Sequence, residues 1–159
     1  MKRPLFTLAL IASLAACKGQ ESKPAPAPVL SVTDGVVKLA AVEGRPGAAY
    51  FTLHGGAAPD RLTAVSSPKA ATIELHESKM EAGMMSMRAL TGVDVAAGGH
   101  VEFKPGGNHA MLFGVDPAVK PGAIVPLHFT FQSGASLDSE AKVIAAGDDM
   151  PAMDMHEGH

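Results

Sequence analysis

The chain has 159 residues, enough for one domain but too few for two well-packed cores once terminal segments are set aside. It is 47% hydrophobic, has no Trp and one Tyr, and carries 17 Gly and 12 Pro, which is typical of short strands joined by tight turns. The net charge of −3, with Lys and Arg scattered, gives no basic stripe and excludes nucleic acid as a partner. A single Cys excludes an internal disulfide and any multi-Cys zinc or iron–sulfur site.

The N-terminus has the pattern of an export signal. Lys2 and Arg3 precede an apolar run over residues 4–16, and these 13 residues are too few for a spanning helix, which needs about 20. The run ends in Leu14-Ala15-Ala16-Cys17, which resembles the lipobox of bacterial lipoproteins. We therefore predict a signal peptide over residues 1–16 and a lipid anchor at Cys17, which places the domain on a membrane of the bacterial cell envelope, facing the periplasm.

The residue after the anchor and the segment beyond it refine this expectation. Lys18 stands where an Asp commonly signals retention in the inner membrane of Gram-negative bacteria, which favours the outer membrane in such a source. Residues 17–28 alternate Pro with Ala near their end and contain no large apolar side chain beyond Cys17, so we expect an extended linker.

Residues 29–146 show short apolar runs separated by turn formers and no helical period, which predicts a single all-β domain, a sandwich or a barrel. Within residues 125–131, the alternation predicts that Val125, Leu127, Phe129 and Phe131 face the core. The expected strands cover residues 29–32, 36–40, 48–54, 62–66, 71–76, 85–93, 100–103, 109–115, 123–131 and 136–145.

The composition changes at residue 147, where a short polar segment begins that cannot add a packed element. We expect residues 147–159 to be a disordered tail. It nevertheless concentrates thioethers, imidazoles and carboxylates, which together can bind Cu(I) or Cu(II) at a secondary, pH-sensitive site. The candidate ligands there are Met150, Met153, Met155, His156 and His159.

The domain shows no pattern of a nucleophile with its base or of paired catalytic carboxylates, so we do not expect an enzyme. Its distinctive side chains are thioethers and imidazoles. His109 and Met111 are two residues apart and share one face of the expected strand, while Ala110 and Leu112 take the other. His76 is expected at a strand end, pointing away from the core, and a loop carrying Met80, Met84, Met85 and Met87 follows it.

Thioether sulfur is a soft, neutral ligand that selects Cu(I), and imidazole can complete such a site. Taken singly, each Met is more often a filler of core gaps, and each His is more often an ordinary hydrogen-bonded residue. It is their combination that favours copper. His54, His100 and His128 have no neighbouring Met and are interpreted as structural or surface residues.

The spacing of four of these residues resembles the PCu(A)C family of periplasmic copper chaperones. That family's motif is His, ten residues, Met, twenty-one residues, His, one residue, Met, and His76, Met87, His109 and Met111 match every position and interval. The resemblance covers residues 29–146 and implies a cupredoxin-like Greek-key β-sandwich. It also implies Cu(I) binding by these four side chains and transfer of the metal to a copper-accepting envelope protein.

The recipient implied by the resemblance is the copper centre of cytochrome c oxidase, through its subunit II or a Sco-type protein. Two alternatives stay open: a lipoprotein that sequesters copper for tolerance, and an adhesion or structural module that needs no metal. A blue-copper electron carrier is disfavoured because it requires a thiolate and the only Cys lies at the anchor. We expect the domain to be a monomer.

Overall fold

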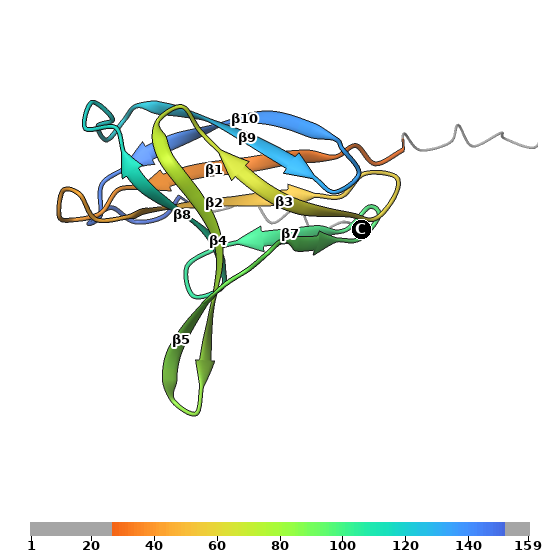
Figure 1. Ribbon diagram of the computed structural model, residues 1–159, viewed down its shortest axis with the longest axis horizontal. Coiled ribbons are helices and arrows are strands. Elements are labelled where there is room, and N and C mark those ends of the chain that lie inside the picture. The colour runs from red at the N-terminus through yellow and green to blue at the C-terminus, as the bar shows by residue number, and fades with distance from the viewer. Residues whose placement is uncertain (1–26, 152–159) are drawn as a thin grey trace, which may run out of the picture.

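The computed structural model describes residues 27–151 and is built from ten β-strands (Figure 1). The expectation of an all-β domain is confirmed. The strands are β1 (Ser31–Lys38), β2 (Gly47–His54), β3 (Asp60–Ser66), β4 (Ala70–Glu81), β5 (Met84–Ala89), β6 (Val93–Val95), β7 (His100–Phe103), β8 (Asn108–Val115), β9 (Ile124–Phe131) and β10 (Ser136–Ile144).

All ten strands belong to one hydrogen-bonded sheet in the order β5-β4-β8-β7-β2-β1-β10-β9-β3-β6. β3 and β4 lie near opposite ends of this order yet contact each other, so the sheet folds over on itself around the core. β1 is parallel to β10 and antiparallel to β2. The first half of β2 pairs with β8 and the second half with β7, which holds β8 against the centre of the body.

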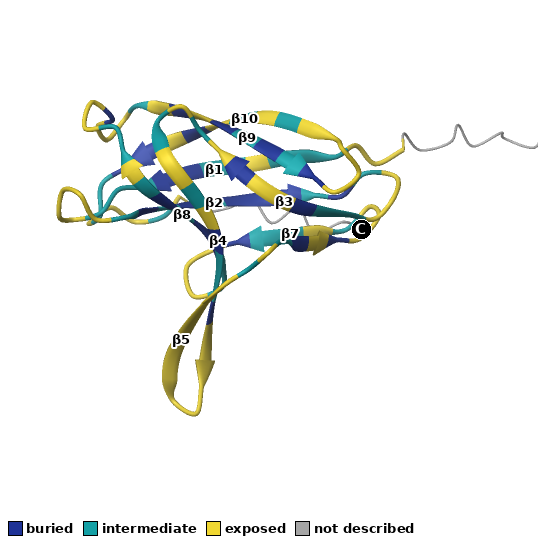
Figure 2. Cartoon of the chain, in the orientation of Figure 1, coloured by how far each residue is buried: buried dark blue, intermediate teal, exposed yellow. Residues whose placement is uncertain are grey.

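Buried residues recur between exposed ones along the strands (Figure 2), and the buried apolar side chains form one core. Phe51 and Phe103 are fully buried and stack with ring centroids 4.2 Å apart, while Phe129 meets Phe51 edge-on at 5.0 Å. In β9 the four residues that the alternation assigned to the core are all buried, so that prediction is confirmed. This rigid body supports the strands that carry the candidate ligands.

The structure corrects two of the expected strand patterns. The expected strands over residues 29–32 and 36–40 form the single strand β1, because Asp34-Gly35 makes a bulge in the pairing with β2 instead of a turn. The expected strand over residues 85–93 is divided into β5 and β6, which pair with different partners, β4 and β3.

The largest correction concerns the expected methionine loop. Its residues continue β4 to Glu81 and return as β5, so the two strands form a β-hairpin that projects from the body (Figure 1). The turn consists of Ala82 and Gly83, both with positive φ (50° and 81°), which is the geometry of a two-residue type I′ turn. An Asn-Gly pair would have predicted this turn, whereas Ala-Gly does not.

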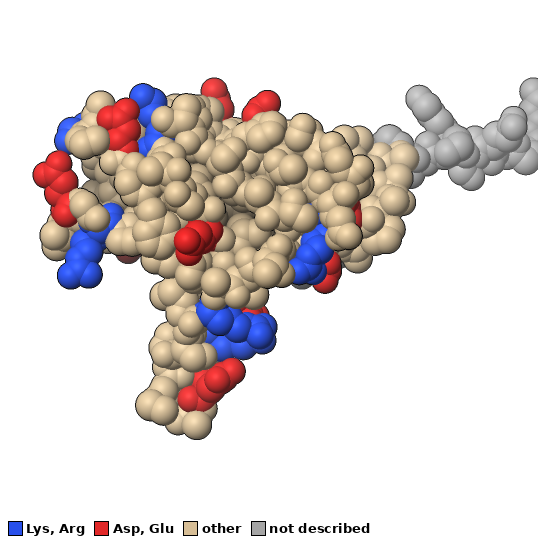
Figure 3. Space-filling view, in the orientation of Figure 1, with Lys and Arg blue, Asp and Glu red and all other residues tan. Residues whose placement is uncertain are grey.

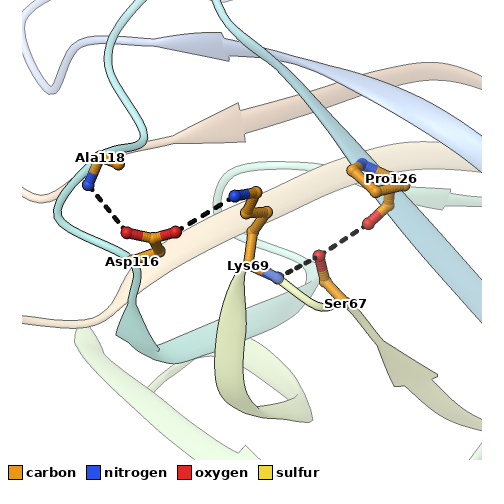
Figure 4. A network of polar contacts seen from close by, with 5 residues as sticks. All are labelled: Ser67, Lys69, Asp116, Ala118 and Pro126. Atoms are coloured by element: carbon orange, nitrogen blue, oxygen red, sulfur yellow. Dashed lines mark hydrogen bonds and ion pairs between the residues drawn. The ribbon is translucent and has the colours of Figure 1, made fainter.

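A polar network fixes the other end of β4 to the body (Figure 4). The Lys69 ammonium lies 3.2 Å from the Asp116 carboxylate, which also accepts a 2.9 Å hydrogen bond from the Ala118 amide. The Ser67 hydroxyl donates to the Pro126 carbonyl at 2.7 Å and accepts from the Lys69 amide at 3.2 Å. The turn before β4 is therefore tied to the segments that follow β8 and begin β9.

Strand structure spans residues 31–144, inside the expected domain limits. Just beyond it, the Asp148 carboxylate accepts a hydrogen bond from the Ala145 amide at 2.8 Å, and the Asp148 carbonyl accepts one from Lys38 at the same distance. Residues 27–151 contain no helix with the length and apolar character needed to cross a membrane.

Candidate metal centre

The two histidines of the predicted motif are cross-strand neighbours. β4 and β8 are antiparallel, and His76 lies directly opposite His109 in their register. Directly opposed residues of an antiparallel pair point to the same face of the sheet. The two rings accordingly lie with centroids 5.9 Å apart and planes inclined by 29°. Residues 33 positions apart in the sequence thus present adjacent imidazoles.

Each of these rings has one nitrogen held by an acceptor. Nε2 of His76 lies 3.0 Å from the Glu74 carboxylate, and Nδ1 of His109 lies 3.0 Å from the Gly107 carbonyl oxygen. A carboxylate and a carbonyl can only accept, so in the neutral rings these nitrogens carry the hydrogen. The lone pairs are then left on Nδ1 of His76 and Nε2 of His109. Such fixing of the tautomer by an oxygen partner is the usual environment of metal-ligating His.

The buried Nδ1 atom of His76 lacks a hydrogen-bond partner. Among the described residues it is the one buried side-chain nitrogen or oxygen without a hydrogen-bond partner. An unpaired buried acceptor costs free energy, roughly 1 to 3 kcal/mol, unless something else satisfies it. A metal ion accepting its lone pair would do so, and the donor set around it fits a soft ion.

Met111 and Met87 supply thioethers on the same face as the histidines. Met111 lies two residues beyond His109 on β8, opposite Glu74, and Met87 lies on β5 opposite Ser78. Met87, His109 and Met111 line one surface pocket. His76 does not line this pocket, but its ring lies beside that of His109. The structure therefore brings all four predicted side chains to one face of three adjacent strands.

The exposure of these groups differs from what the sequence suggested. His76 lies within β4 and not at a strand end, because β4 continues into the hairpin. Met87 lies on β5, within the residues 85–93 expected to form a strand. His109 is buried, with 7% of its surface exposed, while Met87 is 56% exposed. The site is thus closed on the histidine side and open on the side of Met87.

The face of β4 that points away from the candidate metal centre is apolar in the body and charged in the hairpin. Leu75 is buried in the core, but Glu77, two residues on, forms ion pairs with Arg88 of β5 at 2.6 Å and with Lys79 at 3.1 Å. Arg88 and Lys79 lower the pKa of the Glu77 carboxyl group from its usual value. In Figure 3, charged atoms gather on one side of the projecting hairpin. By the β4–β5 register, the other face of the hairpin carries Ser78, Met80, Met85 and Met87 and no charged residue.

Three further residues at the site were not identified from the sequence. Glu74 orients His76, and Tyr50 and Ser78 line the pocket with Met87 and Met111. Burial raises the pKa of the Tyr50 hydroxyl. Strand alternation could have found Glu74 and Ser78, which share a face with His76, but Tyr50 comes from a distant strand whose register the sequence does not give.

The other histidines keep the roles expected for them. His54 lies opposite His100, with ring centroids 6.4 Å apart, and its Nε2 is 3.0 Å from the Thr33 hydroxyl. His128 pairs with Asp138 at 2.7 Å. No Met accompanies either arrangement in the registers of β2, β7, β9 and β10. The His54–His100 pair therefore offers an internal control for the His76–His109 pair.

The remaining predicted site residues fall almost entirely outside the described part of the chain. Met150 is described and partly exposed. Cys17 and the tail residues Met153, Met155, His156 and His159 lie outside residues 27–151, so the anchor and the tail site stay predictions. Within residues 27–151, His, Cys, Asp and Glu side chains form no cluster of three or more that could hold a metal ion. The histidines of the site are accompanied by thioethers instead.

Comparison with known proteins places the chain in a family. The family model of the LpqE-like lipoproteins matches residues 30–143, which include every strand except the last residue of β10. The chain belongs to the LpqE-like lipoprotein family. Among curated proteins, none matches the chain.

Solved structures identify the fold. The apo PCuAC domain of PmoF2 aligns with a TM-score of 0.62 and 17% identity over 80% of this chain and all of that domain. Its copper-bound form aligns with a TM-score of 0.60 and 16% identity over 76% of this chain and 99% of that one. CuI-DR1885 from Deinococcus radiodurans aligns with a TM-score of 0.57 and 25% identity over 81% of this chain and 85% of that one. The fold is that of the PCuAC domain, a cupredoxin-like architecture, as the resemblance implied.

Proposed function

We propose that the chain is a copper chaperone of the bacterial cell envelope that binds Cu(I) and passes it to an acceptor protein. The observation that carries this proposal is the His76–His109 pair, which shares one face of the sheet with Met87 and Met111 and in which Nδ1 of His76 is buried without a hydrogen-bond partner. The similarity to the copper-bound PmoF2 domain and to CuI-DR1885 supports it.

The ligand chemistry suits a carrier of Cu(I). Two imidazoles and two thioethers are neutral, so the bound ion keeps its single positive charge and the soft sulfur atoms favour Cu(I) over harder divalent ions. The half-exposed Met87 is the ligand most accessible to an incoming partner. Copper can then leave by stepwise exchange of ligands, without any change of oxidation state, and the chain acts as a carrier and not as an enzyme.

We further propose that the domain is a monomer held at the membrane through Cys17, with the outer membrane as its location in a Gram-negative source. Its recipient is an envelope copper acceptor, either subunit II of cytochrome c oxidase or a Sco-type protein. Support for the anchor comes from the Leu14-Ala15-Ala16-Cys17 pattern and the lipoprotein character of the family.

Deletion in the source organism tests delivery against sequestration. If the chain delivers copper, the deletion strain loses oxidase activity when copper is limiting, and the wild-type gene restores it whereas His109→Ala does not. His54→Ala, from the other cross-strand histidine pair, is the matched control and should restore activity fully. Normal oxidase activity in the deletion strain, combined with sensitivity to excess copper, would overturn delivery and identify a sequestering protein.

A further inference from the structure

The β4–β5 hairpin carries three thioethers on the face that bears the candidate metal centre. Met80 lies directly opposite Met85, and Met87 lies two residues beyond Met85 on the same strand. Since side chains alternate along a strand and opposed residues share a face, Met80, Met85 and Met87 point to one side. Met84 pairs with Glu81 and points to the other.

None of these methionines belongs to the hydrophobic core or packs against it. Met80, Met85 and Met87 are 65%, 58% and 56% exposed, and every residue of β5 is exposed. Leaving three large apolar side chains in water on a projecting hairpin gains nothing for stability. In Figure 2, β5 and the end of β4 nearest the turn are exposed, whereas β4 is buried or half-buried nearer the body.

We propose that Met80, Met85 and Met87 form a second Cu(I) site, an entry site at the outer part of the hairpin. Directly opposed side chains have Cβ atoms about 5 Å apart, and diagonal neighbours lie within about 8 Å. Met is unbranched and has three rotatable bonds, so three such sulfur atoms can converge on one ion. Three neutral thioethers form a soft donor set that selects Cu(I).

Met87 links this site to the centre described above. It shares the outer face with Met80 and Met85, and it lines the pocket that also contains His109 and Met111. A Cu(I) ion bound at the hairpin can therefore keep its bond to Met87 while Met80 and Met85 are replaced by the imidazoles and Met111. Only ligands exchange, and the ion remains Cu(I) throughout. This transfer step rests on the proposed function, whereas binding at the hairpin does not.

The charged residues of the hairpin lie on the face opposite the methionines, which favours entry of Cu(I) from the methionine face. Glu77, Lys79 and Arg88 engage one another in ion pairs on the charged face. The β4–β5 register places Glu81 on the charged face as well, so the methionine face has no carboxylate to bind hard cations such as Mg²⁺ or Ca²⁺, which require oxygen ligands. The methionine face of the hairpin thus presents thioethers and no charged side chain.

The test is anaerobic titration of the full chain with Cu(I) while the methyl signals of its methionines are followed by NMR. The variant His76→Ala/His109→Ala removes the imidazoles of the inner centre, so its remaining hairpin binding can be observed separately. In this variant we expect Cu(I) to shift the signals of Met80, Met85 and Met87. Adding Met80→Leu and Met85→Leu should weaken this binding by more than about tenfold, since losing two ligands costs at least as much as losing a group that positions one.

Met84→Leu, on the opposite face of the same hairpin, is the matched control and should leave binding at the hairpin unchanged. The proposal is overturned if Cu(I) leaves the Met80 and Met85 signals unmoved, which would indicate a protein-docking face instead, or if Met84 responds equally. Failure of the inner centre would appear differently. In that case His76→Ala/His109→Ala would bind Cu(I) at Met87 and Met111 as tightly as the wild type, whatever happens at Met80 and Met85.

Discussion

At the scale of single residues, Glu74 determines how His76 can serve as a ligand. Its carboxylate accepts the Nε2 hydrogen and leaves the lone pair on Nδ1. Oxygen partners of this kind fix the orientation and tautomer of the ring. The arrangement predicts that copper affinity depends on a residue that does not touch the metal.

Glu74→Gln is therefore expected to weaken Cu(I) binding about tenfold while the fold is retained, because loss of such a partner typically costs 10- to 100-fold. Competition with a Cu(I) chelator measures the change. Glu77→Gln, three residues on and on the other face of β4, is the control and should alter affinity by less than about twofold. Equal effects of the two variants would contradict the role given to Glu74.

Asp60 shows how a single carboxylate contributes to stability away from the site. It accepts hydrogen bonds from the Ser133 hydroxyl at 2.5 Å and from the Arg61 amide at 2.8 Å. These bonds, the one from Ser133 foremost, lower the pKa of the Asp60 carboxyl group from its usual value. Protons consequently bind more tightly to Asp60 in the unfolded chain than in the folded one.

The stabilisation from Asp60 is thus present above its ordinary pKa, about 3.9, and is lost as the pH falls through the lower pKa of the folded state. Asp60→Asn should lower the free energy of unfolding at pH 7, and the difference from the wild type should shrink as the pH falls below about 4. Urea unfolding at a series of pH values checks this. A difference that stays constant with pH would show that the charge is not responsible.

At the scale of elements, the hairpin depends on a two-residue turn that the sequence did not reveal. Ala82 adopts a φ of 50°, which is costly for a residue with a Cβ atom, while Gly83 adopts 81° at no such cost. Ala82→Gly should stabilise the hairpin and Gly83→Ala should destabilise it, each by about 1 kcal/mol. Amide hydrogen exchange within β5 measures both. The account fails if the two variants shift exchange in the same direction.

Sequence patterns predicted the body of the domain more accurately than the hairpin. The alternation of apolar residues in β9 gave the correct core residues because burial on one face imposes that pattern. Among hairpin residues 77–89 only Ser78 is buried, so residues 77–84 lack the apolar alternation that marks a strand. The motif spacing predicted the four ligands, yet only the register of β4 with β5 and β8 brought them to one face.

At the scale of the whole molecule, the aromatic core holds the layers that position the site. Phe51 contacts both Phe103 and Phe129 and is fully buried. Phe51→Ala should reduce the free energy of unfolding by about 3 to 5 kcal/mol. Thermal unfolding with and without Cu(I) checks this, and the bound ion should stabilise the variant as it does the wild type. A loss below about 1 kcal/mol would contradict this view of the core.

The central claim is that His76, Met87, His109 and Met111 bind one Cu(I) ion together, and chelator competition tests it most directly. We expect His76→Ala, Met87→Leu, His109→Ala and Met111→Leu each to weaken the tightest Cu(I) equivalent by more than about tenfold. The controls His54→Ala and Met84→Leu, which lie off this face, should bind as the wild type does. Wild-type affinity in a variant lacking all four side chains would contradict the account.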